Sequence, residues 1–131
     1  MKRTLYIFFG GFLGAILRSL LFSIEIIGTK DLFPLNTVLV NLIGCFFLSL
    51  IAFTVGKKAT FNQDLYFAVT TGLIGAFTTF STFSKDLGTL IYSNFWLYAI
   101  VYLLISIVGG FIGVFLAYKT SEIVYKKTKT N

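Results

Sequence analysis

The sequence predicts an all-α integral membrane protein with four transmembrane helices. Of its 131 residues, 56% are hydrophobic and 12% are charged, and the mean hydropathy is +0.88. A water-soluble domain of this size cannot bury so much apolar surface in one core. Four stretches are long enough to cross the hydrocarbon layer, which takes about 20 helical residues. They are Leu5–Ile27, Leu35–Val55, Leu65–Ser84 and Phe95–Tyr118.

The first stretch, Leu5–Ile27, is predicted to be a membrane helix and not a cleaved signal peptide. Its apolar run is too long for a signal peptide, and it contains no clean cleavage site. Gly10 and Gly14 lie four residues apart, as do Gly109 and Gly113 in the fourth stretch. Small residues at this spacing let helix backbones approach closely in lipid. Helix packing is therefore the expected role of both pairs.

The second and fourth stretches each carry a row of polar or small residues at four-residue steps. The rows are Thr37, Asn41, Cys45 and Ser49 in the second stretch and Tyr98, Tyr102, Ser106 and Gly110 in the fourth. Residues four apart share one face of a helix. Each row can form hydrogen bonds between helices or line a polar path, and the residues alone leave both open. An amide such as Asn41 needs partners in hydrocarbon.

The third stretch contains the run TTGLIGAFTTFSTFS. Gly72 and Gly75 weaken the helix, and the β-branched pair Thr78 and Thr79 follows them. A break here would expose backbone carbonyls, which a membrane tolerates only where protein, water or an ion satisfies them. The residues alone allow a small-cation site made of carbonyls or a kink satisfied by threonine hydroxyls.

Three phenylalanines in this run, Phe77, Phe80 and Phe83, are spaced three apart and share one helix face. Ordinary packing is one interpretation. The other depends on the electropositive ring edge, which with neutral donors beside it can hold a small anion without a fixed charge. Weak and multiple sites of this kind favour conduction over tight binding.

The basic residues are unevenly distributed over the links between the predicted spans. The side that holds both termini and the middle link carries eight of them: Lys2, Arg3, Lys57, Lys58, Lys119, Lys126, Lys127 and Lys129. The opposite side carries Lys30 and Lys85. Because basic residues accumulate on the cytoplasmic side, we predict cytoplasmic termini in a bacterial plasma membrane. The net charge of +6 therefore reflects topology, and no nucleic-acid partner is predicted.

The sequence offers few residues that could carry out catalysis. There is no histidine, and Cys45 is the single cysteine. It has no cationic neighbour in sequence to activate it, so no nucleophile and base can be paired. We predict a single domain over residues 1–131 that is not an enzyme.

Three segments resemble the small fluoride channels of the CrcB/Fluc family, and the resemblance covers essentially the whole chain. They are GGFLGAILR at Gly10–Arg18, NLIGCF at Asn41–Phe46 and GLIGAFTTFSTFS at Gly72–Ser84. The TTFSTF run is the most specific of these signals. Ala76 departs mildly from the family pattern, in which many members have a second glycine after Gly75.

The resemblance implies an antiparallel dimer with two pores that passes fluoride passively out of the cell and so protects it from fluoride toxicity. It implies a third span over about residues 65–92, with a break near 75–79 at the membrane midplane. A structural, untransported sodium ion would be held there by the backbone carbonyls of Gly75 and Thr78. Arg18 corresponds to an arginine near the pore vestibule, although a charge that reaches toward the interface is the alternative. The positions that match the family's fluoride pore are Asn41, Phe80, Phe83, Ser81, Thr82, Tyr102 and Ser106.

The charge bias bears on the partner in this dimer. An antiparallel homodimer requires one chain to insert in both orientations, whereas the count of eight to two favours a single orientation. We therefore predict a heterodimer with an oppositely oriented chain of the same family, and otherwise a homodimer. Fluoride and the lipid bilayer are the other predicted partners.

Two other functions stay open. A small multidrug-resistance exporter also has four helices in antiparallel dimers, but it depends on a membrane-embedded glutamate in the first helix and lacks the TTFSTF run. Glu25, at the end of the first span, is the candidate for that residue. The second alternative is a subunit of a heteromeric membrane complex that does not conduct by itself.

Overall fold

A computed structural model describes residues 1–24, 33–55 and 62–129 of the chain. All regular structure in these residues is helical. The elements are α1 (Lys2–Ser23), α2 (Leu35–Val55), α3 (Gln63–Phe67), the π-helix η1 (Ala68–Ile74), α4 (Gly75–Phe77), α5 (Phe80–Tyr92) and α6 (Trp96–Lys129).

Four helical segments in the described residues are long and apolar enough to cross a membrane. They are Lys2–Ser23, Leu35–Val55, Gln63–Tyr92 and Trp96–Lys126. The prediction of an all-α fold with four spans is confirmed, and the chain is a multi-pass membrane protein. The last helix continues beyond the predicted limit at Tyr118, because hydropathy marks where a helix leaves the hydrocarbon and not where the helix itself ends. The last residues of the predicted first span lie outside the described residues.

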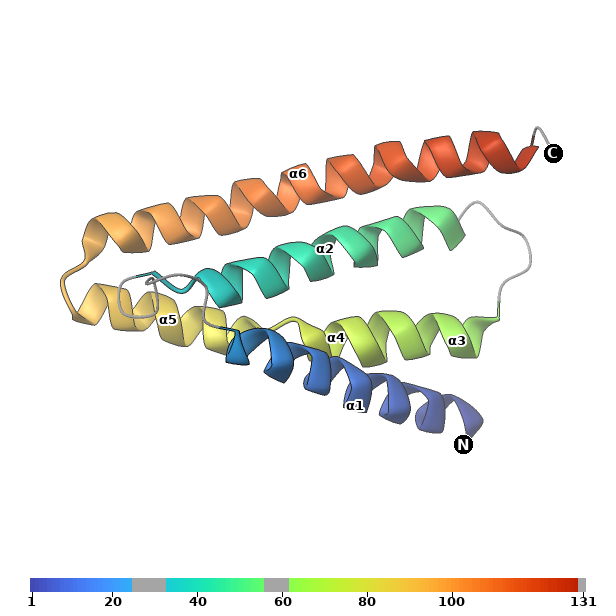
Figure 1. Ribbon diagram of the computed structural model, residues 1–131, viewed down its shortest axis with the longest axis horizontal. Coiled ribbons are helices and arrows are strands. Elements are labelled where there is room, and N and C mark those ends of the chain that lie inside the picture. The colour runs from blue at the N-terminus through green and yellow to red at the C-terminus, as the bar shows by residue number, and fades with distance from the viewer. Residues whose placement is uncertain (25–32, 56–61, 130–131) are drawn as a thin grey trace.

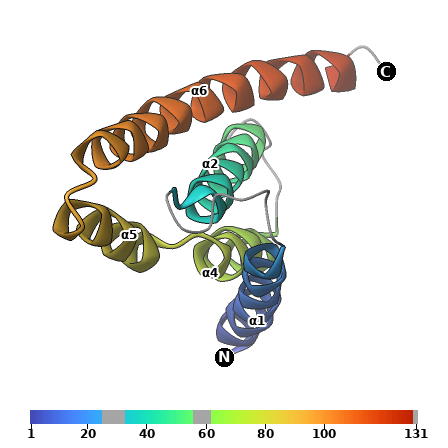
Figure 2. The same cartoon turned by 60° about the vertical axis from the view of Figure 1, so that its left-hand side comes forward.

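The segments run back and forth along the long axis of the molecule, so that the N-terminus and the C-terminal end of α6 lie at the same end (Figure 1). α6 contacts α2 along its length, and α1 contacts η1 and α4. Figure 2 shows α2 between α6 on one side and α4 on the other. This central position brings α2 into contact with both neighbours.

Glycines bring α1 and η1 into direct backbone contact. Gly10 and Gly14 are buried, and a Cβ at either position would collide with the carbonyl oxygens of Ala68 and Leu73, respectively. From the other side, a Cβ at Gly72 would lie 2.6 Å from the Ile7 carbonyl oxygen. The predicted packing role of the first glycine pair is confirmed, because only glycine permits such an approach.

The contact between α2 and α6 is looser. A Cβ at Gly109 would lie 2.9 Å from the end of the Leu42 side chain, and at Gly113 it would lie 3.9 Å from the nearest atoms. α6 begins after a tight turn at Asn94, whose φ of 61° lies in the left-handed region. The Phe95 N–H donates to the Leu90 carbonyl at 2.9 Å, a bond that closes the end of α5.

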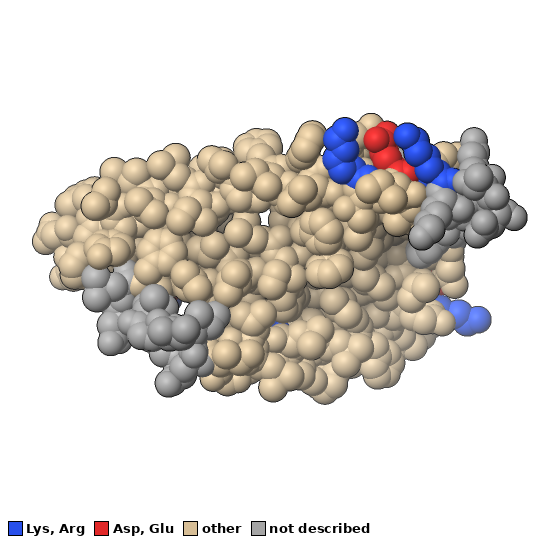
Figure 3. All heavy atoms as spheres, turned by 45° about the horizontal axis from the view of Figure 1, so that its top comes forward, with Lys and Arg blue, Asp and Glu red and all other residues tan. Residues whose placement is uncertain are grey.

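Charged side chains gather at the end of the molecule where the termini lie, and the long middle of the face in Figure 3 is almost free of them. At this end Arg3 of α1 donates to Asp64 at 2.9 Å, and its guanidinium lies 4.9 Å from the centre of the Phe67 ring. Asn62 caps α3 by accepting from the Asp64 and Leu65 N–H groups. The uncharged middle is what a hydrocarbon environment requires.

Candidate functional site: a polar region between helices α2, α5 and α6

Two extended residues separate α4 from α5. α4 ends at Phe77, and the backbone angles are φ −74° and ψ 159° at Thr78 and φ −147° and ψ 116° at Thr79. α5 begins at Phe80. Gly75 and Thr78, the predicted sodium ligands, therefore lie on the helical side and on the first extended residue of this interruption. Its depth in a membrane stays a prediction.

Asn41 pairs with the extended residue Thr79 through two reciprocal hydrogen bonds. The Thr79 N–H donates to Asn41 Oδ1 at 2.8 Å, and Asn41 Nδ2 donates to the Thr79 carbonyl at 3.0 Å. An extended residue presents its N–H and C=O in the same direction, so the amide bonds it as a neighbouring β-strand would. This pairing gives an acceptor to the Thr79 N–H, which the helix interruption leaves without a helical partner, and it adds a second donor to the Thr79 carbonyl.

Three hydroxyls gather at the N-terminus of α5. Thr79 Oγ1 accepts from the Thr82 N–H at 3.1 Å and so caps the helix. It also donates to Thr82 Oγ1 at 2.9 Å and lies 3.3 Å from Ser81 Oγ. The structure thus brings the predicted pore residues Ser81 and Thr82 together around Thr79, which the sequence analysis named only as part of a helix-weakening pair.

A row of aromatic rings leads away from these hydroxyls. The Phe80 and Phe83 ring centres are 6.0 Å apart, and Phe83 stacks on Tyr102 of α6 at 5.0 Å with an interplanar angle of 26°. Phe33 meets the other side of Tyr102 edge-on at 5.8 Å. Three of the predicted pore residues therefore form one continuous series of contacts, and Phe80 at its end is 80% exposed.

The inner end of the ring series lies beside a carboxylate that the sequence reasoning missed. Thr37 of α2 donates to Asp86 of α5 at 2.6 Å, and Thr37 is 2% exposed. Both side chains lie close to the Tyr102 hydroxyl, which is completely buried and has no partner in hydrogen-bond geometry among the described residues. Asp86 could have been found, since it follows Phe83 by three residues and shares its helix face.

The remaining predicted residues take different places. Ser106 Oγ donates to the Tyr102 carbonyl of its own helix at 2.8 Å, on the same half-buried side of α6. Cys45 of α2 donates its thiol to the Gly110 carbonyl at 3.6 Å, so the two polar rows do meet. Arg18 is half-buried in α1 and has no hydrogen bond or ion pair with the described residues. The structure does not bring it to the hydroxyl cluster.

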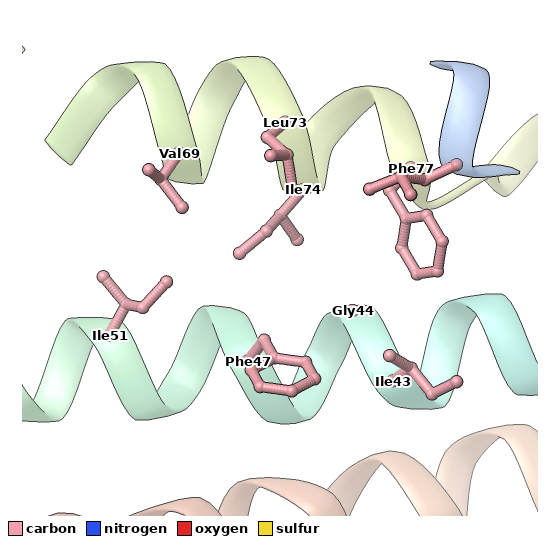
Figure 4. Close-up of a pocket in the computed structure, with 9 residues that line it drawn as sticks. Ile43, Gly44, Phe47, Ile51, Val69, Leu73, Ile74 and Phe77 are labelled. Carbon is pink, nitrogen blue, oxygen red and sulfur yellow. The ribbon is translucent and has the colours of Figure 1, made fainter. Parts of the chain in front are cut away.

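An apolar cavity of about 260 Å³ lies on the other side of α2. Figure 4 shows its side chains from α2 and from the η1–α4 segment pointing toward one another. The lining consists of Leu17, Ile43, Gly44, Phe47, Ile51, Val69, Leu73, Ile74 and Phe77. Because it offers no polar atom to an ion, it is separate from the polar region described above.

These observations define a small multi-pass membrane protein that holds neutral donors and aromatic rings inside its helix bundle. Residues 5–118 match the family described as "CrcB-like protein, Camphor Resistance (CrcB)". The chain therefore belongs to the CrcB-like family, as the resemblance indicated.

Named relatives agree with this assignment. A protein from Bacillus thuringiensis subsp. konkukian (strain 97-27), "Fluoride-specific ion channel FluC 1", is 39% identical over 99% of this chain and 96% of its own length. "Fluoride-specific ion channel FluC" from Phocaeicola vulgatus is 40% identical over 93% of this chain and 100% of its own length. "Fluoride-specific ion channel FluC 2" from Listeria monocytogenes is 46% identical over 61% of this chain and 62% of its own.

The family membership decides one earlier expectation. Because the relatives are named as ion channels, the expectation that the chain is not an enzyme is confirmed. Glu25, on which the exporter alternative depends, lies outside the described residues.

Proposed function

We propose that this chain forms a fluoride-selective channel through which fluoride leaves the cytoplasm passively, protecting the cell from fluoride toxicity. The names of the relatives support this proposal. The observation that carries it is the continuous series from the α5 hydroxyls through Phe80 and Phe83 to Tyr102. This series contains no cation, so an anion that it binds can also leave.

The interruption between α4 and α5 supplies a favourable electrostatic setting for an anion. The N-terminal end of a helix carries a partial positive charge and free N–H groups. α5 has 13 residues, and the hydroxyls of Ser81 and Thr82 lie in its first turn. Fluoride is small and strongly hydrated, so only close and well-directed donors can replace its water. Neutral hydroxyls at a helix N-terminus meet that requirement.

We assign the path as follows. Ser81, Thr82 and Asn41 act as hydrogen-bond donors near the interruption, and the Asn41 amide keeps a second N–H beyond the one given to Thr79. The Phe80 and Phe83 ring edges line the middle of the path. The path continues along α6 past the buried Tyr102 hydroxyl, which lies close to Thr37 and Asp86. The other residues of the path are Ser106 on α6 and Arg18 near a vestibule.

A second, antiparallel chain would complete two such pores. Support comes from groups that are poorly suited to lipid. Gly75 and Ser81 are exposed, as is the Phe80 ring. Exposed hydroxyls and backbone within a membrane segment need a covering protein surface. A partner that packs on this face would cover them and bring two interruptions together.

A structural sodium ion at the centre of the dimer fits the residues present. No cluster of three or more acidic, cysteine or histidine side chains occurs in the described residues, so a cation in that region would depend on backbone oxygens. The helical segment that ends at Phe77 directs the partial negative charge of its C-terminal end toward the interruption. We propose the carbonyls of Gly75 and Thr78 as ligands. Sodium would supply fixed positive potential near both pores.

The partner is proposed to be a related chain of opposite orientation. The lysine and arginine count of eight to two favours cytoplasmic termini for this chain in every copy. Both termini lie at one end of the molecule, which an even number of spans requires. If C-terminal tags on the chain, expressed alone, were found on both sides of the membrane in similar amounts, a homodimer would replace this proposal.

The experiment that tests the function is fluoride efflux from liposomes that contain the purified chain in sodium buffer, followed with a fluoride electrode. The chain is measured alone and together with a family member encoded next to it. Rapid efflux from the chain alone establishes the channel and excludes an obligate heterodimer, whereas efflux only from the pair supports the heterodimer. The Phe80→Ile variant is expected to lose most of the efflux. Absence of efflux from folded protein in both preparations would contradict the proposal.

A further inference from the structure

The Gly75 and Thr78 carbonyls, which are proposed to hold sodium, lack the N–H donors that a continuous helix would give them. Side chains accept from those N–H groups instead. In an α-helix each carbonyl accepts from the N–H four residues later. If the helix were continuous, the donor for the Gly75 carbonyl would therefore be the Thr79 N–H, and the donor for the Thr78 carbonyl would be the Thr82 N–H. In this structure the first donates to Asn41 Oδ1 at 2.8 Å, and the second donates to Thr79 Oγ1 at 3.1 Å.

The diversion begins abruptly. One residue earlier, the Ile74 carbonyl still accepts from its ordinary helical donor, the Thr78 N–H, at 2.9 Å. It also accepts from Thr78 Oγ1 at 3.0 Å. Thr70 likewise donates its hydroxyl back to the Tyr66 carbonyl of its own segment at 2.7 Å. These two threonines add bonds to helical carbonyls, whereas Thr79 and Asn41 remove donors from them.

We propose that Asn41 and Thr79 are positioning residues which keep the Gly75 and Thr78 carbonyls free for a cation. The inference rests on the sodium site of the proposed function and assigns the residues that create it. The two side chains capture the competing N–H groups from opposite sides. Asn41 acts across helices, from α2, and Thr79 acts locally as the cap of α5.

Burial makes this arrangement effective. Thr79 is 6% exposed, and Asn41 is half-buried, so water competes weakly for the captured N–H groups. Without the side-chain acceptors, each N–H would be left without a partner unless it returned to a helical carbonyl. That return would occupy the oxygen that the cation needs. The same Asn41 amide thus contributes to both the anion path and the cation site.

The test is sodium-dependent thermal stability of the purified protein, in its functional assembly in detergent, with N-methylglucamine replacing sodium. A ligand that binds only the folded state stabilises it by RT ln(1 + [L]/Kd), so the melting temperature rises with the sodium concentration. We expect Thr79→Val, which keeps the shape but lacks the hydroxyl, to need about tenfold more sodium for the same stabilisation. One hydrogen bond corresponds to a change of that size. Asn41→Leu is expected to show the same shift.

Matched variants distinguish a loss of carbonyl positioning from a general destabilisation of the protein. Thr79→Ser keeps the capping hydroxyl and should respond to sodium as the wild type does. Thr70→Val removes a buried hydroxyl that bonds a helical carbonyl and should leave the sodium response unchanged, although its melting temperature falls. If Thr79→Val does not fold, Thr79→Ala removes the same hydroxyl without a branched side chain.

The outcomes distinguish this inference from the channel itself. The inference would be overturned if the melting temperatures of Thr79→Val and Asn41→Leu depended on sodium concentration as that of the wild type does. A loss of the sodium response in Thr79→Ser would also overturn it. A wild-type protein that conducts fluoride but gains no stability from sodium would overturn it and leave the channel standing. A sodium response that depends on Thr79 and Asn41, without fluoride efflux, would support it and contradict the proposed function.

Discussion

Two helix contacts in this protein are built in opposite ways. Between α1 and η1, glycines let the backbones touch, and a Cβ at Gly10, Gly14 or Gly72 would lie within 2.6 Å of a carbonyl oxygen of the opposite segment. Between α2, α5 and α6 polar side chains add hydrogen bonds to an apolar cluster, with Asn41 bonded to Thr79 and Thr37 bonded to Asp86. We call these the glycine contact and the polar contact.

The difference shows how a chain with only four spans separates stability from function. In lipid there is little hydrophobic force between helices, so close backbone packing and hydrogen bonds must hold them together. The glycine contact uses packing and offers no polar group to an ion. The polar contact combines an apolar cluster with donors, rings and an extended backbone. A substitution in the first should therefore affect folding, and one in the second should affect conduction.

The largest expected effect comes from adding one methyl group to the glycine contact. Gly14→Ala places its Cβ against the backbone of Leu73, which cannot move away as a side chain could. We expect a loss of about 3 kcal/mol, at the upper end for overpacking, measured by thermal unfolding in detergent. Gly88→Ala is the control, because no atom lies within 4 Å of its Cβ. Equal melting of the two variants would contradict the proposed division of roles.

In the polar contact, Asn41→Leu is expected to reduce fluoride efflux about 100-fold while the protein still folds. The variant removes the acceptor of the Thr79 N–H, at about 1–3 kcal/mol, and it also removes an amide donor from the proposed path. A loss of about 2.7 kcal/mol corresponds to 100-fold. Initial efflux rates from liposomes measure the effect. Thr54→Val is the control, since among the described residues the Thr54 hydroxyl bonds the Leu50 carbonyl of its own helix. Full efflux in Asn41→Leu would show that the polar contact is structural.

The sequence was sufficient for the glycine contact and for the existence of four spans. Spacing by four residues and hydropathy are local properties, and they identified Gly10 and Gly14 directly. Residue patterns singled out Asn41, Phe80 and Phe83, and the resemblance assigned them to a fluoride pore. It could not supply the partners of these residues, because a tertiary pairing such as that of Asn41 with Thr79 joins residues 38 positions apart. Asp86 was overlooked because it lies beside Lys85 in a predicted link, whereas α5 continues through both.

The aromatic series gives a smaller expected effect. Phe83→Leu removes the ring that stacks on Tyr102 at 5.0 Å, and such ring contacts contribute about 0.5–1.5 kcal/mol beyond burial. We expect fluoride efflux to fall about tenfold. Phe53→Leu is a matched control, because Phe53 meets another α6 tyrosine, Tyr118, edge-on at 5.5 Å outside the polar contact. If fluoride efflux fell equally in both variants, the effect would come from general packing between helices and not from the aromatic series.

The smallest effect is expected at the charged end of the molecule. Arg3→Gln removes the ion pair with Asp64, in which the two side chains are 50% and 34% exposed. Pairs of this kind contribute about 0–1 kcal/mol, and salt screens them. The melting temperature should fall slightly at low salt and match the wild type at 1 M salt, where the Debye length is about 3 Å. A large loss of folding would mean that this end supports the glycine contact.

The most direct test of the central claim compares fluoride and chloride release from the same vesicles. Liposomes that contain the wild-type chain, with its partner if one is required, are loaded with both anions, and each release is followed with its own electrode after a potassium ionophore is added. A path made of neutral donors and ring edges at the polar contact predicts that fluoride leaves rapidly and chloride is retained. Release of both anions at similar rates, or of neither from folded protein, would contradict a fluoride-selective channel.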